Sequence, residues 1–443
     1  MPPNHVRFRF LALQLAGAFA LAASSQAAHA QLRLPGGLPA LPGVSLSNPS
    51  LLDKDHGLVR QLQRDLPDLR DLRVTLNARL LRQHPEALET DPRGALAVRH
   101  EIIAFDPSPA ALATASTAGL RVLRSSGAGE TGLAVVVLGV PDGASTAAML
   151  ERLRTLDPDG VYDFNHLYTG SGGSGGSGAA SAAPAPARAG AAIRVGLVDS
   201  GVDSSHAAFA NANIERWGCA GQAVPDSHGT AVAALMVGEA PPFKGGAPGA
   251  QLFAADIYCG NPAGGAADRI AAALAWLSGQ HVGVINLSLV GPPNQGLERL
   301  VATLVKRGHL LVAAVGNDGP AAPPLYPASY PGVVGVSAVG RSGNLLPEAA
   351  RGPQVMFAAP GNNMLSAAVG NPAWRAVRGT SFAAPLVAAL LAEQLPAPDP
   401  ARAAQAVAAL ARQAVRPAGV TVSNETGYGI VGADLRTDPA AFR

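Results

Sequence analysis

Residues 378–394 read R-G-T-S-F-A-A-P-L-V-A-A-L-L-A-E-Q. Gly379 and Thr380 form a turn, and the apolar run after them predicts a buried helix. Pro385 is expected in about the first turn of that helix, where a missing N–H costs little. Ser381 then stands at a helix N-terminus, where unpaired N–H groups and the helix dipole can support a nucleophile facing an oxyanion. The competing interpretation is that Ser381 only caps the helix, because serine is a favoured cap residue.

From residue 191 onward, apolar strands alternate with helices. The expected strands cover residues 193–198, 251–257, 282–289, 310–315 and 333–339. The expected helices cover residues 230–237, 266–277, 297–307, 382–394 and 401–415. This alternation predicts an α/β fold, a mostly parallel sheet with helices on both faces. Functional side chains are then expected at the carboxyl ends of the strands.

Three polar residues occupy suitable places beside these elements. Asp199 directly follows the strand R-V-G-L-V, where a carboxylate can orient an imidazole, although aspartate is also a turn former. His228, in D-S-H-G-T, follows a polar turn and precedes an apolar helix. It is expected to be partly exposed and free to act as a general base, the alternative being a polar residue that starts a helix. Asn317 closes a strand, and its amide can donate to an oxyanion, although turn asparagines are commoner.

In chain order these residues give an Asp–His–Ser set, Asp199, His228 and Ser381, which is the order found in subtilisin. The flanking motifs resemble those of the subtilisin-like serine proteases (subtilases, peptidase family S8) over residues 191–436. The matching stretches are D-S-G at 199–201, H-G-T at 228–230, G-A-P-G-A-Q-L at 246–252, G-N at 316–317, G-T-S-F-A-A-P at 379–385 and G-Y-G-I-V-G-A-D at 427–434. The four motifs that carry the site residues, at 199–201, 228–230, 316–317 and 379–385, stand in the family's order, which makes a chance match very improbable.

The resemblance implies a role for each matching residue. Ser381 would be the nucleophile, His228 would take and return its proton, and Asp199 would hold the imidazole tautomer. Asn317 would stabilise the tetrahedral oxyanion. The backbone of a polypeptide substrate would pair with an edge strand made of Ser288, Leu289, Val290 and Gly291.

Two departures from the family pattern bear on packing and on metal binding. Ala231 stands where many members have a second histidine, which should affect packing more than chemistry. Residues 237–245 form a short connection with one acid, Glu239, so the long calcium-binding loop of many members is missing. No metal site and no required cofactor are therefore expected, and structural calcium is doubtful.

The residues before the peptidase-like region divide by composition. Residues 1–30 resemble a bacterial-type signal peptide, with early arginines, a short apolar run and an A-H-A cleavage pattern. Residues 31–94 form a lead-in with helical spacing over 58–83, interrupted at Pro67. Residues 170–190 are a Gly/Ser/Ala/Pro linker, whose G-x-S-x-G and G-x-G-x-x-G matches are accidents of low complexity. Residues 437–443 are a short tail.

Residues 95–169 show the order β-α-β-β-α-β of a ferredoxin-like α+β domain. Strands are expected over 95–105, 120–123, 133–140 and 160–167, and helices over 109–118 and 145–156. Nothing in this segment carries obvious chemistry. Because family members are often made with a pro-domain of this pattern that assists folding and inhibits the enzyme, the resemblance implies the same role here.

Composition limits the remaining possibilities. The chain has 443 residues, 48% of them apolar, and a net charge of +2, with no basic stripe that would suit nucleic acid. After signal removal no membrane span is expected, so the protein should be exported to the periplasm or the medium.

Cys219 and Cys259 form no CxxC motif. In an exported protein they are either disulfide-bonded or two unlinked buried thiols.

These observations favour an exported serine endopeptidase made as a precursor, with polypeptide substrates and its own pro-region as inhibitor. The alternative is a catalytically silent subtilase-like protein that binds peptides, although it would have no reason to keep Asp199, His228, Asn317 and Ser381. An esterase-type hydrolase is disfavoured because the only G-x-S-x-G motif lies in the linker.

Overall fold

The computed structural model describes residues 69–127, 129–170, 193–416, 419 and 421–442. The predicted signal at 1–30, the lead-in up to residue 68 and the linker at 171–190 lie outside the described residues. Of the helices predicted over 58–83, the described part is α2 (Leu69–Gln83). Within the described ranges, no helix combines the length and the apolar character that crossing a bilayer requires.

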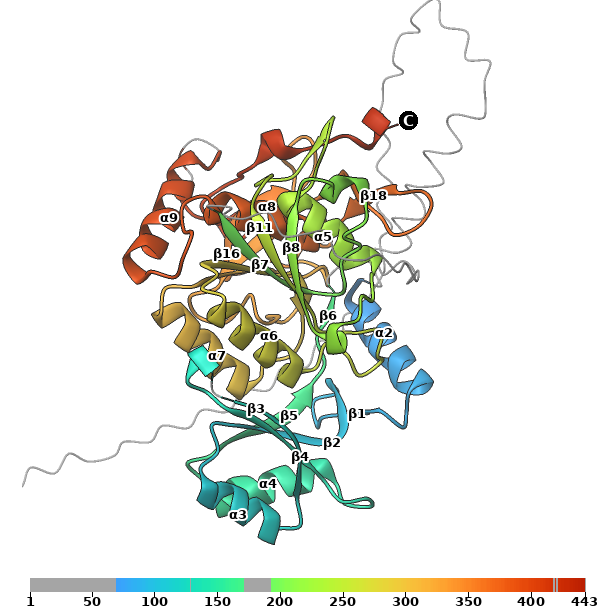
Figure 1. Cartoon of the computed structure of the whole chain (residues 1–443), viewed down its shortest axis with the longest axis vertical. Coiled ribbons are helices and arrows are strands. Elements are labelled where there is room, and N and C mark those ends of the chain that lie inside the picture. The colour runs from blue at the N-terminus through green and yellow to red at the C-terminus, as the bar shows by residue number, and fades with distance from the viewer. Residues whose placement is uncertain (1–68, 128, 171–192, 417–418, 420, 443) are drawn as a thin grey trace, which may run out of the picture. The chain divides into compact units, whose positions relative to one another are not determined.

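A seven-stranded sheet forms the centre of the C-terminal region (Figure 1). Its order is β16-β15-β14-β12-β7-β11-β8, and every pairing is parallel. The strands are β7 (Arg194–Asp199), β8 (Asn213–Trp217), β11 (Gln251–Asp256), β12 (Val284–Leu287), β14 (Leu310–Ala314), β15 (Val334–Val339) and β16 (Val355–Pro360). Most of these strands are continuous apolar runs, as expected for strands buried on both faces.

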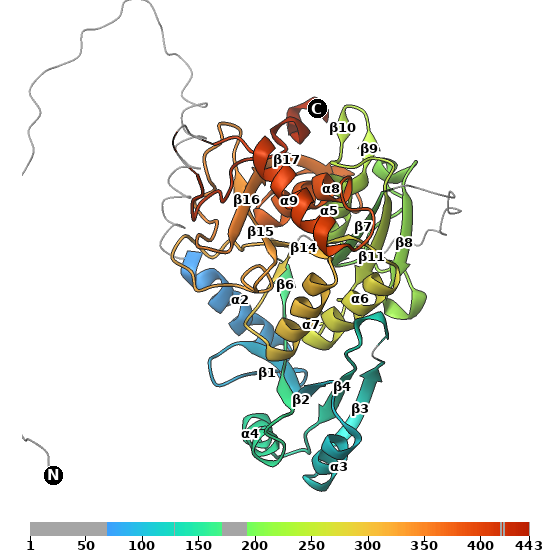
Figure 2. The ribbon, with the colours of Figure 1, turned by 90° about the vertical axis from the view of Figure 1, so that its left-hand side faces the viewer.

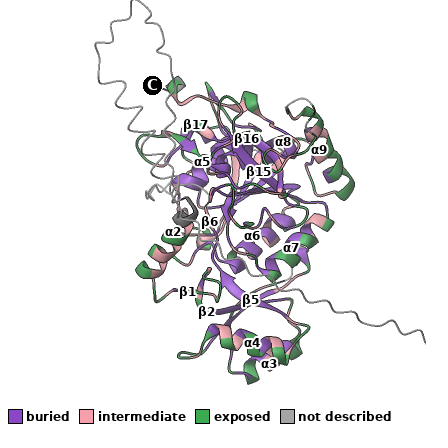
Figure 3. Ribbon diagram, turned by 180° about the vertical axis from the view of Figure 1, so that it is seen from behind, coloured by how far each residue is buried: buried purple, intermediate pink, exposed green. Residues whose placement is uncertain are grey.

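Helices cover both faces of this sheet, which confirms the predicted α/β class. They are α5 (Ser227–Val237), α6 (Ala267–Gly279), α7 (Gln295–Lys306), α8 (Thr380–Ala392) and α9 (Pro400–Gln413). Alternate residues of each strand point to opposite faces, so Leu197 packs with α5, α8 and α9 while Val198 packs with α6 and α7. Figure 3 shows α5 and α8 almost wholly buried, as befits helices that are apolar all round.

Short antiparallel pairs complete the C-terminal region. They are β9 (Glu239–Ala240) with β10 (Phe243–Lys244), and β17 (Asn362–Ala367) with β18 (Trp374–Arg378). A third pair joins distant segments of the chain, because β6 (Thr169–Gly170) pairs with β13 (Leu289–Val290). The strand predicted over 282–289 is therefore two strands, β12 in the middle of the sheet and β13, which follows the carboxyl end of β12 and pairs only with β6.

The N-terminal region is an antiparallel sheet with two helices. Its elements are β1 (Leu88–Thr90), β2 (Leu96–Phe105), α3 (Pro109–Thr117), β3 (Arg121–Ser126), β4 (Val135–Gly139), α4 (Thr146–Leu156) and β5 (Val161–His166). β2 pairs with β1, β4 and β5, and β4 pairs with β3, which reproduces the predicted β-α-β-β-α-β order. β1, a three-residue strand, was not predicted.

The two faces of this small sheet have different partners (Figure 2). One face packs on α3 and α4, with Leu150 and Leu153 in its core. The other face packs on α6 and α7, and the ring of Phe105 lies against Gly296 so closely that a Cβ there would sit 1.7 Å from it. Because β5 leads directly into β6, the N-terminal region places its last strand beside β13, which follows the carboxyl end of β12.

Candidate active site

Ser381 is the second residue of α8 and is completely buried. The N-cap is Gly379, at φ 131°, with no side-chain cap, so the capping-only interpretation of Ser381 is wrong. Glycine suits this position because a side chain would be strained at that φ. Pro385 was expected in the first turn but is the sixth residue of the helix. It has no N–H to offer the carbonyl of Ser381, four residues earlier.

Ser288 supplies the missing partner. Its hydroxyl donates to the Ser381 carbonyl oxygen at 2.8 Å, while Ser381 Oγ lies 3.2 Å from the Ser288 carbonyl and donates to it. The side chain of Asn286 in turn donates to Ser288 Oγ at 2.9 Å. The candidate nucleophile is therefore tied directly to the edge strand that the sequence predicts for substrate binding.

His228 and Asp199 form a buried pair. Asp199 ends β7, and His228 lies in the first turn of α5, with 2.7 Å between Nδ1 and Asp199 Oδ1. Because a carboxylate only accepts hydrogen bonds, Nδ1 carries the proton and Nε2 can act as a base. Burial opposes the charged imidazole, but the charges of Asp199 and Asp226 raise the pKa of His228 above 6.5.

The expectation that His228 is partly exposed is wrong, since only 6% of it is accessible. The reason is the N-terminal region. A Cβ built on Gly170, at the end of β6, would lie 3.5 Å from both Cε1 and Nε2 of the imidazole. The strand β6 thus covers the ring where a substrate would approach it.

Asn317 lies in the turn that follows β14. Its Oδ1 accepts the backbone N–H of Thr380 at 3.0 Å, which fixes the amide beside the N-terminus of α8. The N–H of Gly316 points to Thr380 Oγ1 at 3.3 Å, so the turn is anchored at two successive residues. Asn317 and Ser381, distant in the sequence, are thereby held next to each other through Thr380.

The segment 167–170 lies between the strand β13 and the turn that precedes α6. On one side Thr169 and Gly170 pair antiparallel with Val290 and Leu289. On the other side the N–H of Tyr168 donates to Gly265 O at 2.9 Å, and Leu167 bridges to Ala266. The predicted edge strand is therefore occupied by the protein's own chain, in the antiparallel mode expected for an extended peptide.

Tyr168 fills a pocket beside this strand, and sequence reasoning gave no hint of it. Only 1% of the residue is exposed, and its hydroxyl donates to Pro292 O at 2.8 Å. Tyr258 donates to the Tyr168 carbonyl at 3.0 Å. Gly291 makes room for the ring, since a Cβ there would meet it at 2.5 Å. The site thus has a formed subsite for an aromatic side chain.

Residues 190–429 match the family model described as the subtilase family, peptidase S8. The chain belongs to the subtilase family. The resemblance drawn from the sequence motifs is therefore confirmed, and the Asp199–His228 pair and Ser381 lie inside the matched part of this subtilase.

Two curated relatives and one solved structure extend the comparison. The chain is 35% identical to subtilisin-like protease 1 of Arthroderma gypseum over 218 residues, covering 46% of this chain and 44% of that protein. The corresponding protein of Trichophyton rubrum is 34% identical over 218 residues, with 46% and 42% covered. The match thus spans less than half the length of either relative. The crystal structure of fervidolysin from Fervidobacterium pennivorans, a keratinolytic enzyme related to subtilisin, aligns with a TM-score of 0.63 at 19% identity, covering 79% of this chain and 62% of that chain.

An ion pair links α2 to the turn of the subtilase region that carries Asn317. The Arg73 guanidinium binds both carboxylate oxygens of Asp318, with Nη2 at 3.0 Å from Oδ1. Its Nη1 lies 3.4 Å from Thr169 Oγ1 in β6. The two charged side chains are only 21% and 17% exposed, so the pair is partly shielded from water. Arg73 therefore lies over the same strand that covers His228.

Cys219 and Cys259 are joined by a disulfide beside Asp256, the last residue of β11. Asp256 lies in register with Asp199 of the neighbouring strand. Burial raises the pKa of Asp256 to about 6, although the backbone N–H groups of Cys259 and Tyr258 donate to its carboxylate. Within the described ranges, these two cysteines and Asp256 are the one group spaced to hold a metal ion, and the disulfide already engages both sulfurs.

Proposed function

We propose that this protein is a serine endopeptidase that hydrolyses peptide bonds through an acyl-enzyme. The observation that carries the proposal is the 2.7 Å contact between His228 Nδ1 and Asp199, together with a peptide-like strand lying against the same imidazole. Family membership supports it. A catalytically silent peptide-binding relative would not need the buried Asp199–His228 pair.

The proposed mechanism follows from the positions of these groups. Ser381 Oγ attacks the substrate carbonyl while His228 Nε2 takes its proton, and the imidazolium returns the proton to the departing amine. Asp199 keeps the proton on Nδ1 and stabilises the charged ring. Asn317 and the N-terminus of α8 face the developing oxyanion, where losing one donor typically costs about 3 kcal/mol. Water then hydrolyses the acyl-enzyme by the same proton transfers.

We further propose that residues up to 170 act as an inhibitory pro-region. Four contacts besides β6 support this role. Arg73 binds Asp318, Phe105 packs against Gly296, and two side chains of the N-terminal region cap helices of the peptidase region. Asn165 Oδ1 accepts the N–H of Asp268 at 3.1 Å in α6, and Asp163 Oδ2 accepts the N–H of Gln295 at 2.9 Å in α7. The fold likeness to fervidolysin covers 79% of the chain, more than residues 190–429 contain, which agrees with a shared N-terminal region.

The same interface also contains a charge network whose two carboxylates are buried and whose guanidinium is partly exposed. Arg124 of β3 binds Glu101 and Asp268, each at 2.7 Å, and Asn165 donates to both carboxylates. Two carboxylates with one guanidinium are tolerated in a buried place only when their hydrogen bonds are satisfied, as they are here. Asp268 belongs to the peptidase region, so removing the pro-region would leave it without Arg124.

We also propose export to the periplasm or the medium. The signal-like residues 1–30 and the Cys219–Cys259 disulfide support this location, since disulfides persist in oxidising compartments. No cofactor enters the proposed mechanism, and structural calcium is not part of the proposal.

The experiment that tests the function is labelling of the purified protein with a fluorophosphonate, comparing wild type with Ser381→Ala, beside an intact-mass spectrum. We expect labelling of wild type only, with a mass showing that the chain was cut after residue 170. If neither protein is labelled, a trace of exogenous protease is added and labelling is repeated. Labelling that then appears would show a latent precursor, whereas continued absence would favour the silent peptide-binding alternative.

A further inference from the structure

We propose that the cleft strongly prefers glycine, alanine or serine immediately before the bond that is cut. The inference rests on the proposed peptidase function and names its substrate class. It comes from the way the protein's own strand β6 lies in the cleft and from the side chains beyond the end of that strand.

The register of β6 identifies the position concerned. Gly170 pairs with Leu289 and faces His228. In an antiparallel pair, the residue after one in the place of Gly170 lies opposite Ser288. Ser288 exchanges hydrogen bonds with Ser381. That next substrate residue therefore presents its carbonyl to the nucleophile.

The side chain of this substrate residue must point away from His228, because successive side chains of a strand alternate. It therefore points to the side where Thr169 contacts Arg73, which binds Asp318. Gly316, two residues before Asp318, lies on this side, next to the candidate oxyanion residue Asn317. A pocket for the side chain must therefore open between β13 and Gly316.

Leu325 and Val290 fill that space. A Cβ built on Gly316 would lie only 2.5 Å from Leu325 Cδ1 and 3.7 Å from Val290 Cγ1. Both side chains are buried, with exposures of 8% and 0%. Because residue 316 is glycine, no side chain from this position lines the pocket. Leu325 occupies the space that such a side chain would take.

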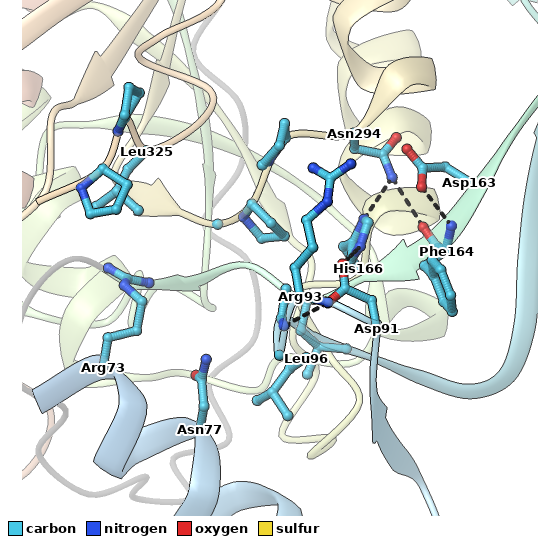
Figure 4. A pocket seen from close by; sticks show the side chains of 18 of the residues that line it. Arg73, Asn77, Asp91, Arg93, Leu96, Asp163, Phe164, His166, Asn294 and Leu325 are labelled. Carbon is cyan, nitrogen blue, oxygen red and sulfur yellow. Dashed lines mark hydrogen bonds and ion pairs between the residues drawn. The ribbon is translucent and has the colours of Figure 1, made fainter. Parts of the chain in front are cut away.

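Leu325 is held in place by its neighbour. The N–H of Gly291 donates to Tyr326 O at 2.8 Å, and the N–H of Tyr326 donates to Gly291 O at 3.1 Å. This pairing joins the segment that carries Leu325 to the edge strand. Figure 4 shows Leu325 among the side chains of the surrounding cavity, which has a volume of about 1080 Å³ and whose lining also includes Arg73. The pairing of Gly291 with Tyr326 therefore fixes the backbone of the segment that carries Leu325 beside the edge strand.

The sequence that follows Gly170 agrees with a shallow pocket. Residues 171–183 read S-G-G-S-G-G-S-G-A-A-S-A-A, so the first thirteen residues after Gly170 are all glycine, serine or alanine. A protease that processes its own precursor here would have to accept such residues.

The test uses processed wild-type enzyme and the peptides succinyl-Tyr-Thr-Gly-X-p-nitroanilide, whose first three residues copy Tyr168, Thr169 and Gly170. X is glycine, alanine, serine, leucine or phenylalanine. The active fraction is first titrated with a fluorophosphonate. We expect kcat/KM for alanine to exceed that for phenylalanine by about 10- to 100-fold, the usual effect of a pocket too small for a side chain.

Leu325→Gly should raise kcat/KM for leucine and phenylalanine by about tenfold or more, with little change for alanine. Leu346→Ala is the matched control, because it removes a buried leucine near β15 without opening this pocket. The control should lower the melting temperature and leave the order of the five peptides unchanged. If Leu325→Gly fails to fold, Leu325→Ala and the wild-type series still decide the question.

Labelled enzyme that cleaves the phenylalanine peptide as fast as the alanine peptide would overturn this inference and leave the proposed function intact. Failure to label, before and after trace proteolysis, would overturn the proposed function instead. As an independent readout, cleavage sites in denatured casein are mapped by mass spectrometry. Cuts after small residues support the inference, and cuts after large apolar residues contradict it.

Discussion

Ser288 and Ser381 exchange two hydrogen bonds, one from the Ser288 hydroxyl to the Ser381 carbonyl at 2.8 Å and one from Ser381 Oγ to the Ser288 carbonyl at 3.2 Å. Pro385 explains the first of these bonds, because it removes the N–H that would otherwise reach the Ser381 carbonyl within α8. The strand that we propose binds substrate and the helix that carries the proposed nucleophile are therefore joined at Ser381.

Ser288→Ala should leave the buried Ser381 carbonyl without a partner and lower the free energy of unfolding by about 1–3 kcal/mol. The double variant Ser288→Ala/Pro385→Ala restores a backbone N–H at position 385 and should recover part of that loss. Chemical unfolding of the four proteins of this cycle, each with Ser381→Ala to prevent autolysis, measures the coupling. Strictly additive effects would show that the two residues do not share the carbonyl.

Arg73→Ala should shorten the delay before activity appears in the purified precursor. The residue makes charge-assisted bonds with Asp318 in a partly buried place, and such bonds contribute about 1.5–3 kcal/mol each. Arg79→Ala is the matched control, since it removes an exposed arginine from the same helix. Activity is followed with a chromogenic peptide at low and high salt. Equal delays for the two variants would mean that α2 does not restrain the cleft.

Asp256→Asn should stabilise the protein near neutral pH. The pKa of Asp256 is about 6 in the folded state against 3.8 ordinarily, so folded protein binds this proton more tightly than unfolded protein. Stability therefore decreases as the pH rises from about 4 to 6, by up to about 3 kcal/mol.

Asparagine carries no charge, so at position 256 it avoids this loss of stability. Its side-chain oxygen still accepts the N–H groups of Tyr258 and Cys259. Melting curves of Ser381→Ala protein, with and without Asp256→Asn, should diverge above pH 6 and converge near pH 4. Asp256→Ala serves as the comparison, because it removes the charge and the acceptor together. A gap that does not depend on pH would exclude titration of Asp256 as the cause.

The acid side of the pH–activity profile should report His228. Burial lowers the pKa of His228, but the charges of Asp199 and Asp226 outweigh burial and raise that pKa above 6.5. The protonated ring cannot act as a base. kcat/KM should therefore fall as the pH decreases through that pKa. Asp226→Asn keeps an oxygen that accepts the N–H of His228 and caps α5. Because the substitution removes a negative charge that raises the pKa of His228, the acidic fall in kcat/KM should move to lower pH. Asp434→Asn, an exposed change of the same charge, should leave the profile in place.

The sequence predicted five of the seven strands of the sheet, its helices and the order of Asp199, His228 and Ser381, because apolar strands and short motifs are local patterns. It did not predict the strands β1, β8 and β16, that His228 is covered, or that Pro385 lies in the second turn of α8. Arg73 and Asp318 are 245 residues apart, and no local pattern marks such a pair. Leu325 lies in a loop, and only its packing against Gly316 shows what it does.

Asn165 and Asp163 cap helices of the peptidase region, so the contacts that we propose inhibit the enzyme also stabilise its fold. Ala266, the N-cap of α6, provides no side-chain cap, and the N–H of Asp268, the second residue of α6, donates to Asn165 of the proposed pro-region. A mutation at Asn165 that releases the inhibitor sooner should also reduce the yield of correctly folded enzyme, and refolding yield and inhibition can be compared in the same preparation. Under the proposed pro-region role, selection for rapid activation is opposed by selection for assembly, and cutting the chain would remove part of the template on which the enzyme folds.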